Sequence, residues 1–318
     1  PLLAPVTHIS DYLLDLAKSH SVVPTTLDCI KSCIVLTIKA CIDVDYSNDY
    51  ALSAILSKYH RECPADVFRV PDWNLVLVLE MLCKAPFEPL YTCSIKHLTY
   101  KCVFLVAMAT SCRISELHAI DFRKVTHDRH WQQVFLEPKL DFLAKNQSSR
   151  AVKQSRTFVL KALVKHINQV HFTPGSLDET LYNKNKLLCP VRALKWYMSR
   201  TKFRRHNKKA LFISLHANHK NDITKQSIAN WIRKTIVLCY ALAGDNTENL
   251  GRATVHEIRS LSASVKFDRN LSIDSLLKSC VWKNGNTFTK HYLRDVSVLS
   301  QELHRLPPLC MSQTVVNT

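Results

Sequence analysis

Four groups of residues in the last two-thirds of the chain carry side chains suited to chemistry on a phosphodiester. They are Arg113, the pair His256 and Arg259, Trp282, and Tyr292. Two arginines can grip the non-bridging oxygens of one phosphate, because the planar guanidinium forms paired hydrogen bonds with oxygen anions. A histidine can transfer a proton, an indole N–H can donate to the same phosphate, and a tyrosine hydroxyl can attack the phosphorus. Their order and spacing together predict a DNA strand-transfer enzyme with a tyrosine nucleophile.

Each of these motifs is ambiguous when it stands alone. Arg113 lies three residues before Glu116, which is also the spacing of an ordinary ion pair on a helix surface. His256 and Arg259 share one helix face at the same spacing, but a lone histidine is more often a structural side chain. Trp282 closes an apolar run and suits a core position as well as a phosphate contact. The hypothesis therefore depends on all of them occurring in this order.

Tyr292 is the predicted nucleophile. A neutral tyrosine attacks poorly, because its hydroxyl has an ordinary pKa of about 10. Two arginines and the phosphate-binding site would stabilise the phenolate and the charge that develops on the phosphate oxygens. The neighbouring His291 would point about 100° away on a helix, so we interpret it as a bystander or a DNA contact.

The order of these residues resembles the catalytic domain of the tyrosine recombinase, or integrase, family. In that family an arginine with a Ser-Glu-Leu-like stretch precedes a lysine on a β-hairpin, a His-x-x-Arg helix, a His or Trp, and the nucleophilic tyrosine. The amino-acid sequence is also similar to that of the recombinases of DIRS-type retrotransposons of animals in four segments, 84–90, 115–120, 189–194 and 287–295. The resemblance extends from about residue 70 to residue 296.

This resemblance implies a mechanism and a set of partners. Tyr292 would form a covalent 3′-phosphotyrosine intermediate without a metal, a cofactor or ATP. A lysine would protonate the leaving 5′ oxygen, and we assign this role to Lys145 at the tip of an expected hairpin, with Lys153 as the alternative. The partners would be double-stranded DNA and three further copies of the chain in a homotetramer, and a mobile-element recombinase would work in the nucleus.

The composition is that of a folded, basic protein. The 318 residues allow one large domain or two ordinary ones, and 47% of them are hydrophobic. No apolar run reaches the roughly 20 residues that cross a bilayer, so we expect no membrane contact. The twelve cysteines form no Cys-x-x-Cys pair, which favours buried, reduced thiols over disulfides or zinc ligands. The chain starts with Pro1 rather than Met, and we expect a piece of a longer polyprotein or a fragment.

Positive charge is concentrated in the second part of the chain. The net charge is +17, and residues 1–70 hold six basic and eight acidic side chains, so the remainder carries +19. Residues 180–221 contain no acid, which favours contacts with backbone phosphates, or a nuclear import signal within 200–209. Eight members of this block are predicted to contact DNA: Lys184, Lys186, Arg200, Lys202, Arg204, Arg205, Lys208 and Lys209.

Helical patterns dominate the chain and define its domains. Residues 1–68 show short amphipathic helices, and Pro64 and Pro71 place a boundary near residue 68. Further helices are predicted over 73–84, 95–110, 190–201, 224–243, 254–266, 272–281 and 287–300, with short strands between 131 and 160 that include Leu140 and Phe142. We expect a mainly α fold with a small antiparallel β-sheet. It would comprise an N-terminal helical, DNA-clamping core-binding domain (1–68), a catalytic domain (69–300) and a tail (301–318) whose last ten residues are loosely ordered.

These expectations together favour a site-specific recombinase or integrase of a mobile element. The main alternative is a DNA-binding protein derived from such an enzyme that no longer cuts DNA. Binding alone does not need a tyrosine, a histidine and two arginines at these spacings, so we favour the enzyme. A type IB topoisomerase would use the same chemistry. A metal-dependent nuclease is disfavoured, because no Asp/Glu cluster with metal-binding spacing occurs near the basic residues.

Overall fold

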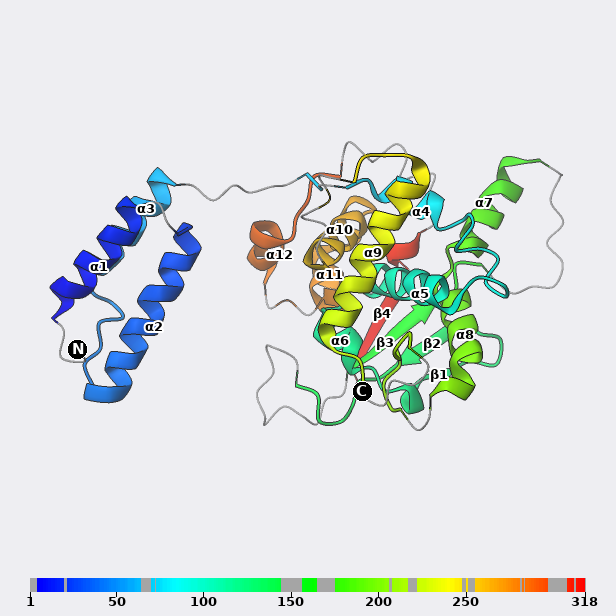
Figure 1. Cartoon of the computed structure of the whole chain (residues 1–318), viewed down its shortest axis with the longest axis horizontal. Coiled ribbons are helices and arrows are strands. Elements are labelled where there is room, and N and C mark those ends of the chain that lie inside the picture. The colour runs from blue at the N-terminus through cyan, green and yellow to red at the C-terminus, as the bar shows by residue number, and fades with distance from the viewer. Residues whose placement is uncertain are drawn as a thin grey trace. The chain divides into compact units, whose positions relative to one another are not determined.

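The computed structural model divides the chain into two compact units, Pro1–Phe68 and Arg69–Thr318 (Figure 1). It describes residues 5–19, 22–63, 70–71, 73–143, 156–164, 175–205, 208–216, 222–247, 250, 255–280, 282, 284–296, 308–311 and 313–317. Among the helices in these ranges, none has the length and apolar character needed to cross a membrane.

The first unit is a three-helix bundle of α1 (Val6–Lys18), α2 (Pro24–Ile42) and α3 (Tyr50–Glu62). Pro24 occupies the first turn of α2, where the missing N–H of proline costs nothing, and the Asp49 carboxylate caps α3 by accepting from the N–H of Leu52. Each helix contributes a fully buried leucine to the shared core, namely Leu13, Leu27 and Leu52. The amphipathic pattern of this segment therefore predicts its fold correctly.

The second unit is built around one buried helix. α5 (Ile95–Thr110) is buried continuously from Leu98 to Thr110, so other elements must cover it on every side. It contacts helices α8 (Pro190–Thr201), α9 (Lys225–Ala243) and α10 (Val255–Asp268). The remaining helices of the unit are α4 (Leu75–Met81), α6 (Ile114–Ala119), α7 (Leu177–Leu187), α11 (Ile273–Cys280) and α12 (Gly285–His291), with short 3-10 turns η1 (Phe122–Lys124), η3 (Lys202–Arg204) and η5 (Leu309–Met311).

A four-stranded antiparallel sheet completes the second unit, with strand order β1-β2-β3-β4. The strands are β1 (Thr126–His127), β2 (Gln133–Leu136), β3 (Arg156–Lys161) and β4 (Gln313–Asn317). In β2 and β3, Gln133 pairs with Lys161 and Leu136 pairs with Phe158. Figure 1 shows β4, at the C-terminal end of the chain, beside β3, and the register places Arg156 opposite Asn317. The fold class expected from the sequence is therefore confirmed.

Three details of the predicted elements are wrong. The last residues are not loosely ordered, because 309–311 form η5 and 313–317 form β4. Leu140 and Phe142 lie outside any strand, and Leu140 is 74% exposed because the chain turns there. The final predicted helix ends at His291 rather than residue 300, so Tyr292 follows the helix instead of lying within it.

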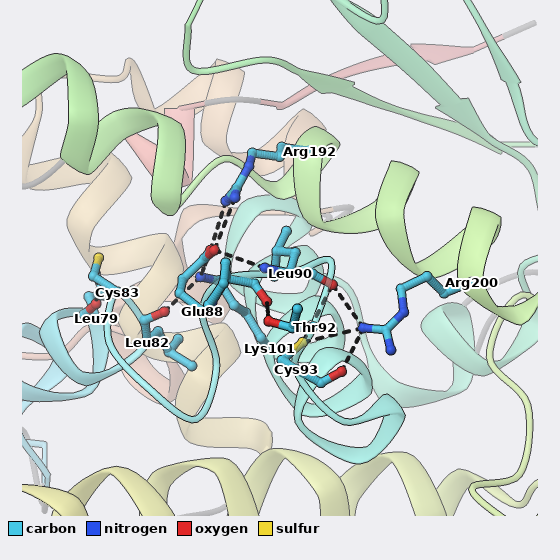
Figure 2. Close-up of polar contacts among 11 residues, drawn as sticks. Leu79, Leu82, Cys83, Glu88, Leu90, Thr92, Cys93, Lys101, Arg192 and Arg200 are labelled. Atoms are coloured by element: carbon cyan, nitrogen blue, oxygen red, sulfur yellow. Dashed lines mark hydrogen bonds and ion pairs between the residues drawn. The ribbon is translucent and has the colours of Figure 1, made fainter.

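A buried ion-pair network fastens α5 and α8 to the segment between α4 and α5 (Figure 2). The Lys101 ammonium, whose side chain is fully buried, lies 2.6 Å from a Glu88 carboxylate oxygen and donates to the carbonyl of Leu82. Arg192 on α8 donates to both oxygens of the same carboxylate, at 2.7 and 3.0 Å. Burial raises the pKa of Glu88, but the hydrogen bonds and charges of Arg192 and Lys101 outweigh it, so this pKa lies below its ordinary value.

Replacing Glu88 with glutamine is expected to lower the free energy of unfolding by about 3–5 kcal/mol, because the buried Lys101 and the half-buried Arg192 lose their counter-ion. Since the folded-state pKa of Glu88 is lowered, its contribution is complete above the unfolded pKa of about 4.3 and disappears as the pH falls through the folded value. Urea denaturation at pH 7, and melting temperatures from pH 7 to pH 3, measure both effects.

Glu80→Gln is the matched control for this experiment. Glu80 forms a half-exposed ion pair with Lys184 at 3.4 Å, so its loss should cost below about 1 kcal/mol. Equal losses in the two variants would show that the buried network does not stabilise the fold.

Candidate active site

Arg113 is positioned by the turn between α5 and α6. Ser111 adopts a left-handed conformation at φ 50°, which ends α5 and turns the chain. Arg113 then becomes the N-cap residue of α6, and its backbone N–H donates to the Glu116 carboxylate at 2.7 Å. The Arg113 guanidinium lies 3.6 Å from the other oxygen of this carboxylate. The ion pair at helix spacing is therefore present, but Glu116 is buried rather than on the surface.

Arg259 approaches the same carboxylate from α10. Its Nη1 lies 3.5 Å from Glu116 Oε2, and its Nη2 donates to the carbonyl of Cys280 at the end of α11. Only 2% of Arg259 is exposed. Glu116 therefore lies between two guanidinium groups, and the three side chains together carry one net positive charge. The sequence indicated Glu116 only as a partner of Arg113, and its second partner depends on how α10 packs.

Trp282 and Tyr292 pack against the Arg259 guanidinium. The centre of this group lies 5.2 Å from the Trp282 ring centroid and 5.5 Å from that of Tyr292. The two ring centroids are 4.6 Å apart, and Phe288 also stacks on Trp282 with centroids 5.4 Å apart. Cation–π attraction of this kind favours a fixed guanidinium position. The structure therefore brings Arg113, Arg259, Trp282 and Tyr292 together, although they come from distant parts of the chain.

Backbone hydrogen bonds fix Tyr292 directly after α12. The Asn284 side chain caps the start of this helix by accepting from the N–H of Thr287, and the N–H of Tyr292 donates to the carbonyl of Phe288 at 2.8 Å. Ser264 on α10 accepts from the N–H of Arg294 and donates to the carbonyl of Tyr292. The tyrosine is thus held to the helix that carries Arg259.

Four buried donors of this site lack a hydrogen-bonded acceptor among the described residues, and two of them, Arg113 Nη1 and Arg259 Nη1, make only the longer ion-pair contacts with Glu116 at 3.6 and 3.5 Å. Among the described residues, no hydrogen-bond partner exists for Arg113 Nη1, Arg259 Nε, Arg259 Nη1 or Trp282 Nε1. Leaving a buried donor unsatisfied costs about 1–3 kcal/mol, and more when the donor is charged. Such groups often mark a ligand site in a native structure. A cluster of cationic and indole donors suits an oxyanion such as a phosphodiester.

A buried polar network lies behind the turn that carries Arg113. Lys266, two turns after Arg259 on α10, donates to the Ser111 hydroxyl at 2.8 Å. Ser111 is also hydrogen-bonded to Ser262 at 2.6 Å, and Ser262 donates to the carbonyl of Met108. Burial lowers the pKa of Lys266. The sequence alone does not indicate a site role for these residues, because their polar contacts form only when α5 and α10 pack together.

One predicted site residue, His256, stands apart from this group, and the predicted general acid is not described. His256 is the second residue of α10, and its side chain is exposed. Its carbonyl accepts from the Ser260 hydroxyl, and within the described residues no hydrogen bond or ion pair links its side chain to the four assembled side chains. Lys145 and its alternative Lys153 lie outside the described residues.

The arginines of the acid-free block serve the fold. Arg200 donates to the carbonyls of Leu90 and Cys93 (Figure 2), and Arg204 donates to that of Leu215. Arg205 is buried, donates to two carbonyls at 3.0 and 2.9 Å, and stacks on Phe122 at 3.6 Å. This placement argues against a phosphate contact by Arg205.

The lysines of the block are more accessible than its arginines. Lys186, Lys202 and Lys209 are exposed, Lys208 is half-buried, and Lys184 is half-buried beside Glu80. The surface charge of this block therefore belongs mainly to lysine, which binds phosphate as a point charge rather than through a bidentate fork.

The cysteines and the acidic side chains show no metal centre in the described parts of the chain. Within those ranges no group of three or more His, Cys, Asp or Glu residues could hold a metal ion. All twelve cysteines are free thiols. The expectation that they are buried is wrong for Cys29, Cys33 and Cys41, which are exposed on α2.

Comparison with known proteins shows a likeness of fold. No protein-family model and no curated protein sequence matches the chain. Among solved structures, it is similar to the XerH site-specific recombinase bound to palindromic difH substrate in a post-cleavage complex. The TM-score is 0.56 at 12% identity, covering 95% of this chain and 71% of that one. The chain therefore has the fold of this recombinase.

Two further solved structures have lower TM-scores. The XerH pre-cleavage complex with difH substrate gives 0.45 at 13% identity, covering 74% of this chain and 54% of that one, so the match spans about half its length. The XerA recombinase gives 0.46 at 14% identity, covering 96% and 93%.

Proposed function

We propose that this chain is a tyrosine recombinase that cuts and rejoins double-stranded DNA. The observation that carries the proposal is a group of donors without a hydrogen-bond partner on Arg113, Arg259 and Trp282. The Tyr292 ring packs against Arg259 and Trp282, and Arg113 joins this group through the Glu116 carboxylate that it shares with Arg259. The likeness of fold supports it, because the XerH structure that shares this fold is a site-specific recombinase bound to its substrate. A DNA-binding protein that had lost catalysis would not need a phenol at this place.

The proposed reaction is an exchange of one phosphodiester for another. The Tyr292 oxygen attacks the phosphorus and loses its proton, while the bond from phosphorus to the 5′ oxygen breaks and that oxygen gains a proton. Arg113, Arg259 and the Trp282 N–H stabilise the negative charge that develops on the non-bridging oxygens. A 5′-hydroxyl from a second strand then attacks the phosphotyrosine and releases Tyr292. Bond energy is retained throughout, so no ATP is required.

Proton transfer is assigned to residues outside the assembled group. We propose His256 for the tyrosine proton and Lys145, ahead of Lys153, for the leaving 5′ oxygen. A substrate with a 5′-phosphorothiolate has a leaving group that needs no proton. This substrate should restore cleavage to Lys145→Ala if Lys145 is the general acid, and to Lys153→Ala if Lys153 is.

The proposal extends to the partners of the chain. Lys184 and Lys186 would hold backbone phosphates of the duplex, and residues 1–68 would form the second half of a clamp around it. We further propose a tetramer on DNA, a nuclear location and an origin in a DIRS-type retrotransposon, all of which depend on the resemblance in sequence motifs.

A trapped covalent adduct tests the proposed function. A pool of nicked duplexes with a randomised core is incubated with the full chain in EDTA, denatured in SDS and analysed for DNA that migrates with the protein. A nick next to the scissile phosphate lets the leaving fragment diffuse away, so the adduct should accumulate. Sequencing the trapped DNA would give the preferred site. Binding without any adduct would favour the non-catalytic alternative, and a requirement for metal would exclude the tyrosine mechanism.

A further inference from the structure

A second basic surface lies on α8 and the turn that joins β1 to β2. It is a groove of about 1170 Å³, to which α8 and η3 contribute Lys195, Lys202 and Phe203, the β1–β2 turn contributes Trp131, and the following loop contributes Lys208 and Lys209. We call it the α8 groove. None of the assembled active-site side chains lines it.

The α8 groove lies beside the end of β2 that starts at Gln133. Trp131 precedes Gln133, which starts β2, whereas Leu136 ends β2 and leads into the segment that carries Lys145. Because β2 and β3 are antiparallel, Lys161 lies at the groove end and Phe158 at the other end. The α8 groove shares no lining residue with the candidate active site.

The groove carries a strong positive charge. No described residue in its lining is acidic. Arg123 is held by Asp121 through two hydrogen bonds, and Arg205 is used internally, so the charge available to a ligand comes from the lysines. Lysines lining a concave surface attract a polyanion, and a row of them suits successive phosphates of one backbone.

Aromatic rings alternate with these lysines. Trp131 stacks on His127 with centroids 3.8 Å apart, and Lys195 Nζ lies 5.2 Å from the Trp131 centroid. Phe203 is 87% exposed, and Lys202 Nζ lies 5.9 Å from its centroid. An exposed phenylalanine adds nothing to the core of its own domain. Flat rings beside lysines are the surface that binds single-stranded nucleic acid, because unpaired bases stack on the rings while the cations hold phosphates.

We propose that the α8 groove binds single-stranded nucleic acid, with a base stacked on Phe203 and phosphates held by Lys195, Lys202 and Lys209. A duplex keeps its bases stacked on one another, so the ring of Phe203 would add nothing to duplex binding. The shared chemistry is an unpaired base on a phosphodiester backbone, in DNA or in RNA. This binding does not depend on strand cleavage at Tyr292.

Fluorescence anisotropy of the full chain with labelled dT12, dU12, U12 and a 20-base-pair duplex tests the base contact. Phe203→Ala should weaken binding of a single strand about 10-fold and leave duplex binding within about 2-fold. Phe203→Leu keeps an apolar side chain without a ring and should lose the same affinity. Binding of dT12 and U12 alike would show a contact to base and phosphate, whereas tighter binding of U12 than of dU12, which differ only in the sugar, would show that the 2′-hydroxyl is also recognised.

Paired lysine variants test the phosphate contacts. The double variant Lys195→Gln, Lys202→Gln removes two charges from the groove. The control double variant Lys84→Gln, Lys96→Gln removes two exposed lysines elsewhere. The control is matched because Lys96 also lies over an aromatic ring, that of Tyr100, at 5.8 Å. For dT12, the groove pair should reduce the slope of log affinity against log salt by about 1.4, at about 0.7 for each phosphate that a lysine no longer neutralises. The control pair should change this slope by less than half of the change caused by the groove pair.

Three results would overturn the proposal. They are equal effects of the two lysine pairs, an equal loss of duplex and single-strand binding in Phe203→Ala, and full single-strand affinity in Phe203→Leu. The second would make the groove a duplex backbone contact, and the third would make it an apolar docking surface. Melting temperatures should match the unmodified chain, since these side chains are exposed.

Discussion

Replacing Tyr292 with phenylalanine is expected to abolish the covalent protein–DNA adduct while DNA binding survives. The substitution removes only the hydroxyl oxygen that would attack the phosphorus, and no other group in the assembled site can form the phosphoester. Phenylalanine keeps the ring that packs 4.6 Å from Trp282 and 5.5 Å from the Arg259 guanidinium. Nicked duplex pools, SDS gels and a binding assay on the same DNA measure the two outcomes separately.

Tyr91→Phe provides the matched control for the Tyr292 variant. Tyr91 is 64% exposed and lies beside Trp196 at a centroid distance of 6.5 Å, so it also loses a hydroxyl next to an indole. Its adduct yield should equal that of the unmodified chain. An adduct that persists in Tyr292→Phe would assign the nucleophile to another residue, and a parallel loss of DNA binding would make Tyr292 an ordinary contact.

Local sequence rules account for most of the helices. The apolar spacing in residues 1–68 predicts three helices, and the side chains of Asp49 and Ser94 mark the first turns of α3 and α5 by capping them. The break after Phe68 falls where two prolines interrupt the helical pattern. These features depend on neighbours within a few positions of each other, which a sequence shows directly.

Long-range pairing accounts for what the sequence could not show. β4 joins the sheet by pairing residues 313–317 with a strand more than 150 positions earlier, and no local pattern specifies that partner. The arginines of the acid-free block look like a DNA-binding surface, but Arg205 donates to carbonyls of its own loop. Composition gives the charge of a side chain, whereas its role depends on which acceptors the fold places beside it.

The candidate site combines both kinds of information. The types and order of Arg113, Arg259, Trp282 and Tyr292 are visible in the sequence. The structure packs Trp282 and Tyr292 against the Arg259 guanidinium. The bridging position of Glu116 between two arginines is visible only in the structure. For His256 the sequence indicates more than the structure shows. Its spacing of three residues from Arg259 predicts a shared site, but its side chain is exposed near the start of α10.

Replacing Arg259 with alanine is expected to slow adduct formation by about 100-fold or more, the scale for losing one transition-state donor. The charge balance of the site gives the reason. Arg113, Arg259 and Glu116 together carry one positive charge, which matches the single negative charge of a phosphodiester, and removing one arginine leaves the site neutral. Affinity for DNA should change far less, because the many other phosphate contacts remain.

Because Arg259 is buried, the alanine variant also removes one partner of Glu116 and creates a cavity beside Trp282. A second variant is therefore needed to separate catalysis from stability. Arg259→Lys keeps the charge but removes the planar fork that can hold two phosphate oxygens. The melting temperature of Arg259→Lys should lie closer to that of the unmodified chain than the melting temperature of Arg259→Ala does. The lysine variant should still form the adduct more slowly than the unmodified chain. Single-turnover rates at saturating DNA separate this loss from weaker binding. Equal losses of binding and cleavage in both variants would make Arg259 an ordinary DNA contact, whereas a lysine variant that cleaves at the full rate would show that charge alone suffices.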